Sequence, residues 1–157
     1  MDIDYRTILS EIDNRKYRYI GSGSGRRVFD LGDGHVIKIA KNKKGIAQNE
    51  VEHRISEETS SQLFAPVISM SEDARYLIME KAERVYSMSE VMWYFRVRTE
   101  RQLLNDPDIH KIIVDYDLVR ADILRKTSWG FIGDELVLID YGFTRYVRER
   151  YYRRRHD

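Results

Sequence analysis

Two short segments near the start of the chain carry residue types that could hold a phosphate group. The first is Gly21-Ser22-Gly23-Ser24-Gly25, whose alternate glycines let the backbone approach a ligand closely and point its N–H groups at anionic oxygens. The second is Lys38, which lies among β-forming residues in Val36-Ile37-Lys38-Ile39 and could neutralise phosphate oxygens. Each has a simpler alternative: a glycine-rich hairpin without a ligand, and a lysine that reaches solvent from a half-exposed strand.

A carboxylate on the following helix could brace Lys38. Glu50 and Glu52 are the candidates. Val51 and Ile55 share the side of Glu52, where the helix would pack on a sheet, whereas Glu50 lies about 200° away around the helix. We therefore predict Glu52 as the partner of Lys38; the alternative is a solvated helix glutamate.

Carboxylates in the last third of the chain could hold a metal ion or act as a base. The apolar run at 136–139 ends in Asp140, which predicts a buried strand that delivers a carboxylate to its edge. Oxygen ligands of this kind suit Mg²⁺. Asp115, Asp117 and Asp122 lie just upstream and could supply a base and further metal ligands. The alternatives are a turn-forming aspartate after the strand and a solvated helix end or loop for the cluster.

The apolar pattern predicts the elements that must position these residues. In the first half we expect an amphipathic helix within residues 1–14, then three strands at about 17–21, 26–32 and 35–41, a helix at 44–58, and two strands at 66–69 and 75–79. Gly32-Asp33-Gly34 predicts the hairpin between the second and third strands.

The second half is predicted to be mostly helical. A capping box formed by Ser87 and Glu90 should open a helical stretch that reaches Leu104, and Asp106-Pro107 should open the next helix. Two strands should flank Gly133-Asp134, and a last helix should run over about 143–155. No repeat, linker or low-complexity tract marks a domain boundary, so we expect a single domain.

The composition excludes several classes of protein. With 157 residues, 42% hydrophobic and 34% charged, the chain is of ordinary globular composition. It has no cysteine, which excludes disulfides and thiolate metal sites. Neither a signal peptide nor an apolar run of about 18 residues is present, so we expect a cytoplasmic protein without a membrane partner. A net charge of +1 gives no global attraction to nucleic acid.

The order of these features resembles that of protein kinases over most of the chain, and the sequence looks like the small kinase-like proteins of bacteria and phages. Against the kinase pattern G-x-G-x-x-G-x-V, the chain has Gly21, Gly23 and Val28, with Arg26 where the third glycine would stand. The resemblance implies that this loop, with Gly25, covers the phosphates of a nucleotide.

The resemblance also assigns roles to the strands and helix that follow. Lys38 takes the place of the kinase strand lysine, and Glu52 takes that of its helix partner. Met79 looks like the residue that guards the adenine pocket, and the segment from Glu80 to Ala82 looks like the hinge whose backbone binds adenine.

Further along, Asp140-Tyr141-Gly142 resembles the metal-binding D-F-G motif. One alignment places Asp115-Tyr116-Asp117-Leu118 on the catalytic H-R-D-L, with Asp122 on the asparagine that follows; a rival places Arg120-Ala121-Asp122 on H-R-D and leaves Thr127 for that asparagine. The first fits at more positions. It makes Asp117 the base, with Asp122 and Asp140 as metal ligands.

The resemblance implies an α+β, protein-kinase-like fold that binds ATP and Mg²⁺. Residues 1–82 would form a small antiparallel sheet with one helix, like a kinase N-lobe, and residues 83–157 a truncated, mostly helical C-lobe. Only 15 residues follow Gly142, so a phosphate acceptor would be a small molecule or a group that a protein partner presents. The expected function is therefore a phosphotransferase; the alternative is an inactive pseudokinase that serves as a binding module.

The arginine-rich end suggests another function, in which guanidinium groups contact nucleic-acid phosphates and tyrosines stack on bases. The residues concerned are Arg148, Arg150, Tyr151, Tyr152, Arg153, Arg154 and Arg155. The simpler interpretation is an amphipathic terminal helix that docks Phe143, Val147 and Tyr151 and exposes its arginines.

Overall fold

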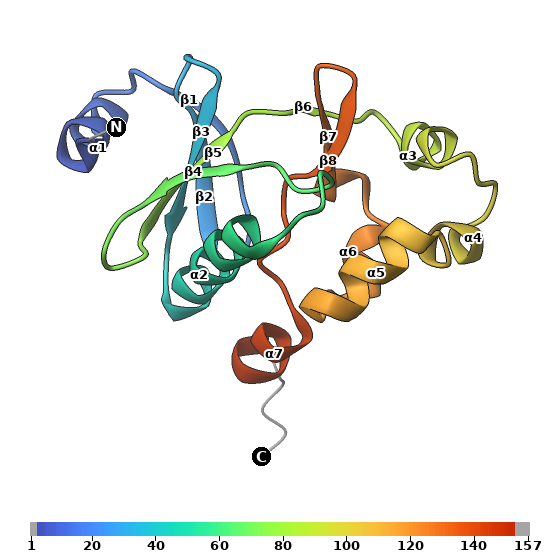
Figure 1. The fold of residues 1–157 in the computed structure, drawn as a ribbon. Helices are drawn as coiled ribbons and strands as arrows, with labels where there is room; N and C mark the ends of the chain where they lie inside the picture. Colours follow the sequence, from blue (N-terminus) through green and yellow to red (C-terminus); the bar gives the residue numbers. More distant parts are fainter. Residues whose placement is uncertain (1–2, 153–157) are drawn as a thin grey trace. The chain divides into compact units, whose positions relative to one another are not determined.

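The computed structural model describes residues 3–152 and divides the chain into two units. The first unit comprises Met1–Glu57 and Pro66–Lys81, and the second Glu58–Ala65 and Ala82–Asp157. Both strands and helices are present, so the α+β class is confirmed (Figure 1). Whether the two units fold as one domain, as the sequence predicts, stays a prediction.

The sheet of the first unit has five strands in the order β1-β2-β3-β5-β4, and all neighbours are antiparallel. The strands are β1 (Arg18–Ser22), β2 (Arg26–Asp30), β3 (His35–Ala40), β4 (Val67–Met70) and β5 (Tyr76–Glu80). The predicted hairpin joins β2 to β3. Gly32 and Gly34 adopt positive φ angles of 78° and 90° there, a backbone region that glycine enters without steric cost.

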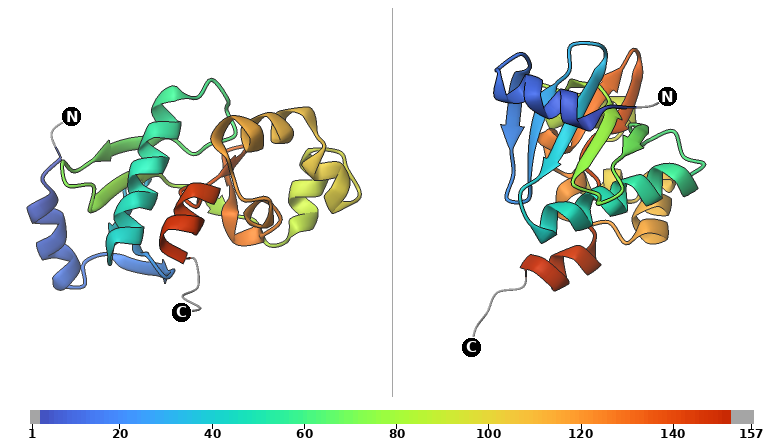
Figure 2. Two further views of the ribbon diagram at one scale, coloured as in Figure 1. Left: turned by 90° about the horizontal axis from the view of Figure 1, so that it is seen from below. Right: turned by 90° about the vertical axis from the view of Figure 1, so that its left-hand side faces the viewer.

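Two helices cover opposite faces of this sheet (Figure 2). Helix α1 (Tyr5–Asp13) packs its partly buried apolar side on Phe29, Ile37, Ile39 and Ile78. The alternate residues of β3 face the other way, toward α2 (Lys43–Glu58), because successive side chains of a strand point to opposite faces. The strand period therefore places Lys38 on the α2 side of the sheet, as predicted.

In the second unit, a smaller sheet has the order β6-β7-β8. It consists of β6 (Glu83–Arg84), β7 (Trp129–Ile132) and β8 (Glu135–Leu138). Gly133, at φ 61°, forms the predicted turn between β7 and β8. The apolar residues of β8 are buried, and Phe64 makes a parallel bridge to Leu138.

The helices of the second unit are short. They are α3 (Met88–Tyr94), α4 (Glu100–Leu104), α5 (Pro107–Tyr116), α6 (Arg120–Ile123), a 3₁₀ turn (Lys126–Ser128), α7 (Arg145–Val147) and a π-helical turn (Arg148–Tyr152). The capping box of Ser87 and Glu90 is present, and Asp106 caps α5 by accepting from the amides of Asp108 and Ile109. No helix within residues 3–152 is long and apolar enough to cross a bilayer.

One helix prediction was wrong, and a second differs from the structure in its first residues and its winding. The stretch up to Leu104 is broken into α3 and α4, because Arg96 turns to a positive φ of 57° and the Thr99 hydroxyl caps a new helix by accepting from the Gln102 amide. The last helix begins at Arg145 rather than at residue 143, because Thr144 is its N-cap, and it changes to π-helical winding after Val147. The part predicted for residues 153–155 lies outside the described residues.

Candidate functional site

Lys38 and Glu52 form a buried ion pair within the first unit. The ammonium nitrogen of Lys38 donates to Oε1 of Glu52 at 2.9 Å. Lys38 is 5% exposed and Glu52 is completely buried, whereas Glu50 is exposed. The structure thus brings together the two residues that the sequence paired and removes the alternative of a solvent-facing strand lysine.

A third residue, which the sequence analysis did not assign to this pair, also binds Glu52. The Arg26 guanidinium donates from Nη1 to Oε1 at 2.7 Å and from Nη2 to Oε2 at 2.9 Å. Its Nη1 also donates to Oδ1 of Asn49 at 3.0 Å, and Arg26 is 6% exposed. The strand period places Arg26 on one face of its strand, but only the pairing of β2 with β3 shows that this is the face of Lys38. Arg26 pairs with Ala40 across the β2–β3 ladder, so it shares the face of Lys38.

The charges around Glu52 hold it ionised. Complete burial by itself would raise the pKa of the Glu52 carboxyl, because a buried charge loses its hydration. The positive charges and hydrogen bonds of Arg26 and Lys38 outweigh this effect and lower the pKa to about 2. Glu52 is therefore a carboxylate at neutral pH, with two cationic partners.

The glycine-rich loop ends in close backbone contact with the start of α2. A Cβ on Gly25 would overlap the side-chain oxygen of Gln48 and lie 3.1 Å from the amide nitrogen of Gly45. The Gly25 carbonyl accepts from the Lys41 amide at 2.8 Å. A Cβ on Gly23, by contrast, would meet nothing within 4 Å. Glycine at position 25 is thus favoured by packing, whereas Gly23 lies in an open part of the loop; Gly21, in β1, is partly buried.

Met79 lies on the same face of the sheet as Lys38. In the β3–β5 ladder Met79 pairs with Val36, and Lys38 pairs with Leu77, so these four side chains share one face. Met79 is 1% exposed. The residue assigned to the adenine pocket is therefore an apolar neighbour of the assigned phosphate-binding lysine.

Two backbone amides of the predicted hinge already donate hydrogen bonds within the first unit. The Glu80 amide donates to the Pro66 carbonyl and the Lys81 amide to the Gly34 carbonyl, both at 2.9 Å. These bonds hold the end of β5 against its neighbours in the first unit. Ala82, the last hinge residue, begins the next segment of the second unit and is partly buried.

In the second unit, Tyr141 anchors the segment that contains Asp140. Its ring is 3% exposed and meets Phe64 edge-on, with ring centroids 4.8 Å apart. Its hydroxyl donates to the backbone carbonyl of Ala65 at 2.7 Å. Tyr141 is thus held both by ring packing and by a buried hydrogen bond. Asp140 itself is exposed.

Asp122, on α6, and Asp140 line one small cavity of about 10 Å³. Burial raises the pKa of Asp122 to about 6; Arg125, which pairs with it at 2.8 Å, and Arg148 oppose this rise, and Asp140 adds to it. The two carboxylates are thus close enough to repel each other. Within residues 3–152 no cluster of three or more potential metal-ligating side chains occurs. A two-carboxylate site suits Mg²⁺, which binds proteins through one or two carboxylates and completes its shell with water and phosphate oxygens.

Asp117 lies apart from this cavity lining. It ends α5 in the left-handed conformation, at φ 55° and ψ 42°, and is exposed. Its backbone carbonyl accepts from the Arg145 amide at 3.0 Å, and its side chain is 3.9 Å from the Arg145 guanidinium. The backbone of Leu118 bridges to that of Thr144. Asp117 is therefore fixed to the segment that follows Gly142.

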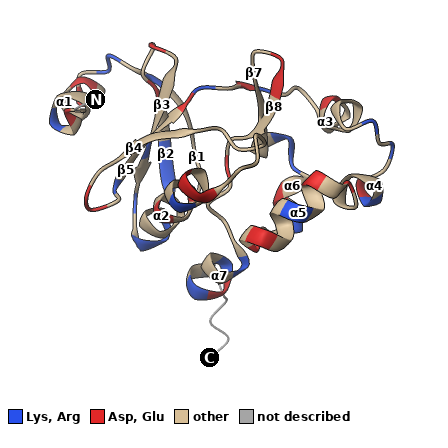
Figure 3. Cartoon of the chain, viewed as in Figure 1, with Lys and Arg blue, Asp and Glu red and all other residues tan. Residues whose placement is uncertain are grey.

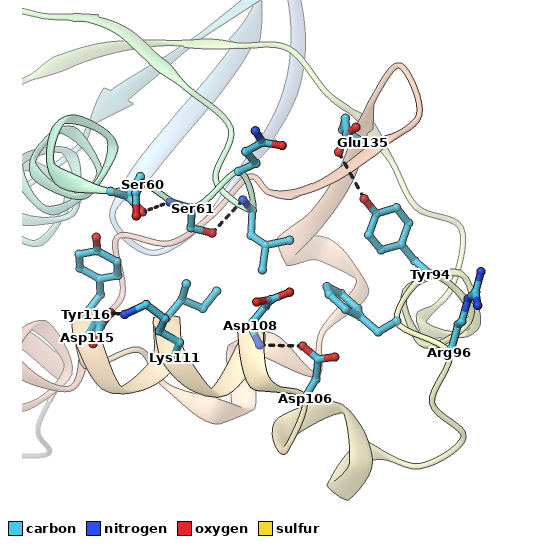
Figure 4. Close-up of a pocket in the computed structure, with 15 residues that line it drawn as sticks. Ser60, Ser61, Tyr94, Arg96, Asp106, Asp108, Lys111, Asp115, Tyr116 and Glu135 are labelled. Carbon is cyan, nitrogen blue, oxygen red and sulfur yellow. Dashed lines mark hydrogen bonds and ion pairs between the residues drawn. The ribbon is translucent and has the colours of Figure 1, made fainter.

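Two members of the acidic cluster, Asp115 and Asp122, line different cavities, and Asp117 lines neither of them. Asp115 lies on α5, where it pairs with Lys111 at 2.8 Å, and both line a larger cavity of about 600 Å³ (Figure 4). The other labelled residues of this cavity are Ser60, Ser61, Tyr94, Arg96, Asp106, Asp108, Tyr116 and Glu135. Asp117, Asp122 and Asp140 do not line this cavity, so it does not contain these three predicted site residues.

The described part of the arginine-rich end carries exposed cations. Arg145, Arg148 and Arg150 are exposed on α7 and the turn that follows it (Figure 3). The Arg150 guanidinium lies 5.4 Å from the ring centre of Tyr151, and Val147 is buried. Arg153, Arg154 and Arg155 lie outside the described residues, so the nucleic-acid alternative stays a prediction.

Two solved structures of APH(2")-IIa are similar to this chain. Its ternary complex with streptomycin and ATP is 17% identical, with a TM-score of 0.45, and its gentamicin complex is 16% identical, with a TM-score of 0.47. In both cases the match covers 90% of this chain and 71% of the other. APH(2")-IIa has a protein-kinase-like fold. No protein-family model and no curated protein matches the chain. A likeness of this degree assigns no role to any residue.

Proposed function

We propose that the chain is a kinase-like nucleotide-binding protein, in which Lys38 holds ATP phosphates and Asp122 and Asp140 hold Mg²⁺. The observation that carries the proposal is the ion pair of Lys38 with Glu52, two charged side chains in the interior of the first unit. Burying charges costs free energy unless they are paired, and a pair of apolar residues would stabilise the fold at least as well. A strand lysine held in this way, beside the glycine-rich loop, is suited to binding phosphate.

The glycine-rich loop and Met79 support the same assignment. A Cβ on Gly23 would meet nothing within 4 Å, so a phosphate can approach the loop backbone closely there, although the Gly23 amide itself donates to the Arg26 carbonyl at 2.9 Å. Met79 is a buried apolar side chain on the face of the sheet that carries Lys38. The Ala82 backbone is the proposed adenine contact of the hinge, since the amides of Glu80 and Lys81 already donate to other residues.

Asp122 and Asp140 are the proposed ligands of Mg²⁺, which would neutralise phosphate charge when bound. The pair fits a divalent cation because the repulsion that helps to raise the pKa of Asp122 would be relieved by a positive ion. Each ligand is held in place by its surroundings. Arg125 pairs with Asp122, and the buried Tyr141 ring fixes the backbone next to Asp140.

For phosphate transfer, the proposal assigns the base to Asp117, with Asp122 as the rival. A carboxylate at this position would accept a proton from the acceptor hydroxyl. One observation favours the rival: Asp122 lines the cavity of Asp140 and Asp117 does not, and a pKa of about 6 suits a base. Asp122 has a function under either alignment, as metal ligand or as base.

A thermal unfolding measurement with ATP and Mg²⁺ tests the proposed function. The native protein should unfold at a higher temperature in their presence, because a ligand that binds the folded state stabilises it by mass action. Asp140→Asn and Lys38→Met should each remove most of this increase. An unfolding temperature of the native protein that ATP and Mg²⁺ do not change would contradict the proposal.

Labelled γ-phosphate then separates a phosphotransferase from a pseudokinase. Release or transfer of label by the native protein supports the enzyme, and nucleotide binding without either supports the binding module. If label is released, the losses in Asp117→Asn and Asp122→Asn identify the base. If the inactive variant still binds Mg²⁺, the residue replaced in it is the base and not a metal ligand.

A further inference from the structure

We propose that Arg125, Arg145 and Arg148 form a binding subsite for a phosphate group in the second unit, beside the candidate bases Asp117 and Asp122. The acceptor in the proposed transfer is accordingly a hydroxyl compound that already carries a phosphate group. This inference rests on the proposed function for its acceptor. The subsite belongs to the second unit alone, so its binding of an anion can be tested without a nucleotide.

Two of the three arginines lie on one face of a short helix that is anchored by buried residues. Arg145 begins α7 and Arg148 caps its end, and a spacing of three residues brings side chains to the same face of a helix. The Thr144 hydroxyl accepts from the Val147 amide at 3.2 Å, and both Thr144 and Val147 are buried. α7 is thus held at its first turn, with both arginines exposed on it (Figure 3).

The arginines are close to the two candidate bases. Nε of Arg145 is 3.9 Å from Oδ1 of Asp117, and the Arg145 amide donates to the Asp117 carbonyl at 3.0 Å. Nη2 of Arg125 is 2.8 Å from Oδ1 of Asp122. Burial raises the pKa of Asp122 to about 6, and the positive charges of Arg125 and Arg148 oppose this rise, so the charge of Arg148 also reaches Asp122.

Neutralisation of the two carboxylates does not account for all three cations. Arg125 already pairs with Asp122, and Arg148 forms no ion pair with another residue in the range 3–152. A further cation beside Asp122 would also repel the Mg²⁺ that this carboxylate is proposed to bind. An anionic ligand would supply the partner that Arg148 lacks within these residues.

The existing ion pairs leave donors for such a ligand. A guanidinium carries five N–H groups, so Arg125 can keep its contact with Asp122 and still donate to a second anion. The side chains of Arg125 and Arg145 are each 60% exposed, so a ligand can reach them from solvent. The ligand would therefore join the existing pairs and need not break them.

The chemistry of three arginines favours a phosphate ester. The planar guanidinium matches pairs of phosphate oxygens and keeps its charge at neutral pH. Three guanidinium groups can donate to all three terminal oxygens of a phosphate dianion, whereas a carboxylate offers two oxygens and a single charge. A cationic acceptor would be repelled at the same place.

An acceptor held by its phosphate can bring its hydroxyl group to the base. In the transfer, the hydroxyl oxygen forms a bond to the γ-phosphorus of ATP while the bond from that phosphorus to the β,γ-bridging oxygen breaks. ADP leaves with the electron pair of the broken bond, and the hydroxyl proton passes to Asp117 or Asp122. The three arginines take no part in these bond changes; they bind and position the acceptor.

The first test titrates inorganic phosphate into the ligand-free protein at low ionic strength and follows the side-chain Nε–Hε NMR signals of its arginines. We expect the signals of Arg125, Arg145 and Arg148 to shift along one saturating curve. Arg148→Met should weaken this binding at least about tenfold, because the phosphate loses a charged donor. Arg101→Met is the matched control, since Arg101 is exposed on α4 of the same unit.

A variant of the first unit identifies where the phosphate binds. Lys38→Met should leave the shifts of the three arginine signals unchanged, because Lys38 belongs to the first unit. The proposal is overturned if the three signals do not move, if their shifts disappear in Lys38→Met, or if Arg148→Met binds phosphate as tightly as Arg101→Met does.

The second test follows labelled γ-phosphate with acceptors that differ only in a phosphate group: glycerol 3-phosphate against glycerol, and ribose 5-phosphate against ribose. Label should pass to the phosphorylated member of at least one pair and not to its neutral partner. Arg148→Met should raise the KM for that acceptor at least about tenfold with a much smaller change in kcat, and Arg101→Met should change neither. Equal transfer to both members of a pair, or transfer to no member of either pair, contradicts this acceptor class.

The two tests separate this inference from the proposed function. If the native protein does not bind ATP, the proposed function and the acceptor class fail together, and the arginine signals still decide whether the second unit binds phosphate. If ATP binds and phosphate does not move these signals, this inference alone fails.

Discussion

The hydroxyl of Tyr141 donates a 2.7 Å hydrogen bond to the backbone carbonyl of Ala65, deep in the second unit. The two residues are 76 positions apart in the sequence, and both are almost completely buried. The contact fixes the backbone directly after Asp140, the proposed metal ligand. The position of this carboxylate therefore depends on a buried aromatic residue that does not itself bind a ligand.

Replacement of Tyr141 by phenylalanine should lower the free energy of unfolding by about 1–2 kcal/mol, since the Ala65 carbonyl loses its buried donor while the ring packing remains. Urea unfolding measures the change. Tyr146→Phe is the matched control, because Tyr146 is 65% exposed, and it should change stability by less than about 0.5 kcal/mol. Equal effects of the two variants would contradict the importance of the hydrogen bond.

A second prediction concerns the contact between the glycine-rich loop and α2. Gly45→Ala should destabilise the protein by about 2 kcal/mol or more, because its Cβ would overlap the Gly25 carbonyl and lie 2.9 Å from Cα of Ala40. Gly23→Ala, where a Cβ meets nothing, should be nearly neutral. Thermal unfolding of the two variants checks the difference, and a neutral Gly45→Ala would show that the loop does not pack on α2.

Acid should weaken the first unit through Glu52. Its folded-state pKa of about 2 lies below the ordinary value of 4.5, so its stabilising contribution is complete above pH 4.5 and is lost as the pH falls toward 2. The loss should be about 3 kcal/mol. Glu52→Gln should flatten the acid limb of the unfolding free energy measured from pH 2.5 to 6, and the exposed control Glu50→Gln should keep it. Identical acid limbs in the two variants would refute the role of Glu52.

Local signals in the sequence predicted most of the elements. The capping box of Ser87 and Glu90 and the caps at Asp106-Pro107 act within a few residues, so they can be recognised without the fold. The pairing of Lys38 with Glu52 was also predictable, because the strand period and the helix period each fix a face. The loop after Tyr94 could not be predicted, because the left-handed conformation of Arg96 interrupts a sequence whose pattern otherwise continues as a helix.

The shared carboxylate was beyond the sequence argument. Arg26 and Glu52 lie 26 residues apart, and their contact depends on how β2 pairs with β3 and how α2 packs on both. The kinase pattern treated Arg26 only as a departure from the third glycine. The division of Asp115 and Asp122 between two cavities likewise depends on the turn at Asp117, where the chain takes a left-handed conformation.

Loss of the proton from Asp122 should lower the free energy of unfolding as the pH rises through the folded-state pKa of this residue. That pKa is about 6, above the ordinary 3.8, so the folded protein binds the proton more tightly and the unfolding free energy falls between about pH 4 and pH 6. Asp122→Asn should therefore be more stable than the native protein at pH 7.5, by about 1 kcal/mol after allowance for the lost pairing with Arg125. Asp134→Asn, in the exposed turn, is the control.

Magnesium should reverse the order of stability of the native protein and Asp122→Asn. At pH 7.5 Mg²⁺ should stabilise the native protein and leave Asp122→Asn unchanged, because the cation relieves the repulsion between Asp122 and Asp140. Unfolding temperatures with and without Mg²⁺ measure the effect. An equal response of the native protein and Asp122→Asn would exclude Asp122 as a metal ligand.

The most direct measurement for the proposed function is the dissociation constant of ATP, determined by isothermal titration in the presence of Mg²⁺. Three proteins suffice: the native chain, Lys38→Met, and Lys41→Met as a control that removes an exposed charge from the segment that follows β3. We predict that the native chain and Lys41→Met bind alike and that Lys38→Met binds at least about tenfold more weakly, a difference of roughly 1.4 kcal/mol. No binding by the native chain, or equal binding by all three, would contradict the role of Lys38 and the proposed function with it.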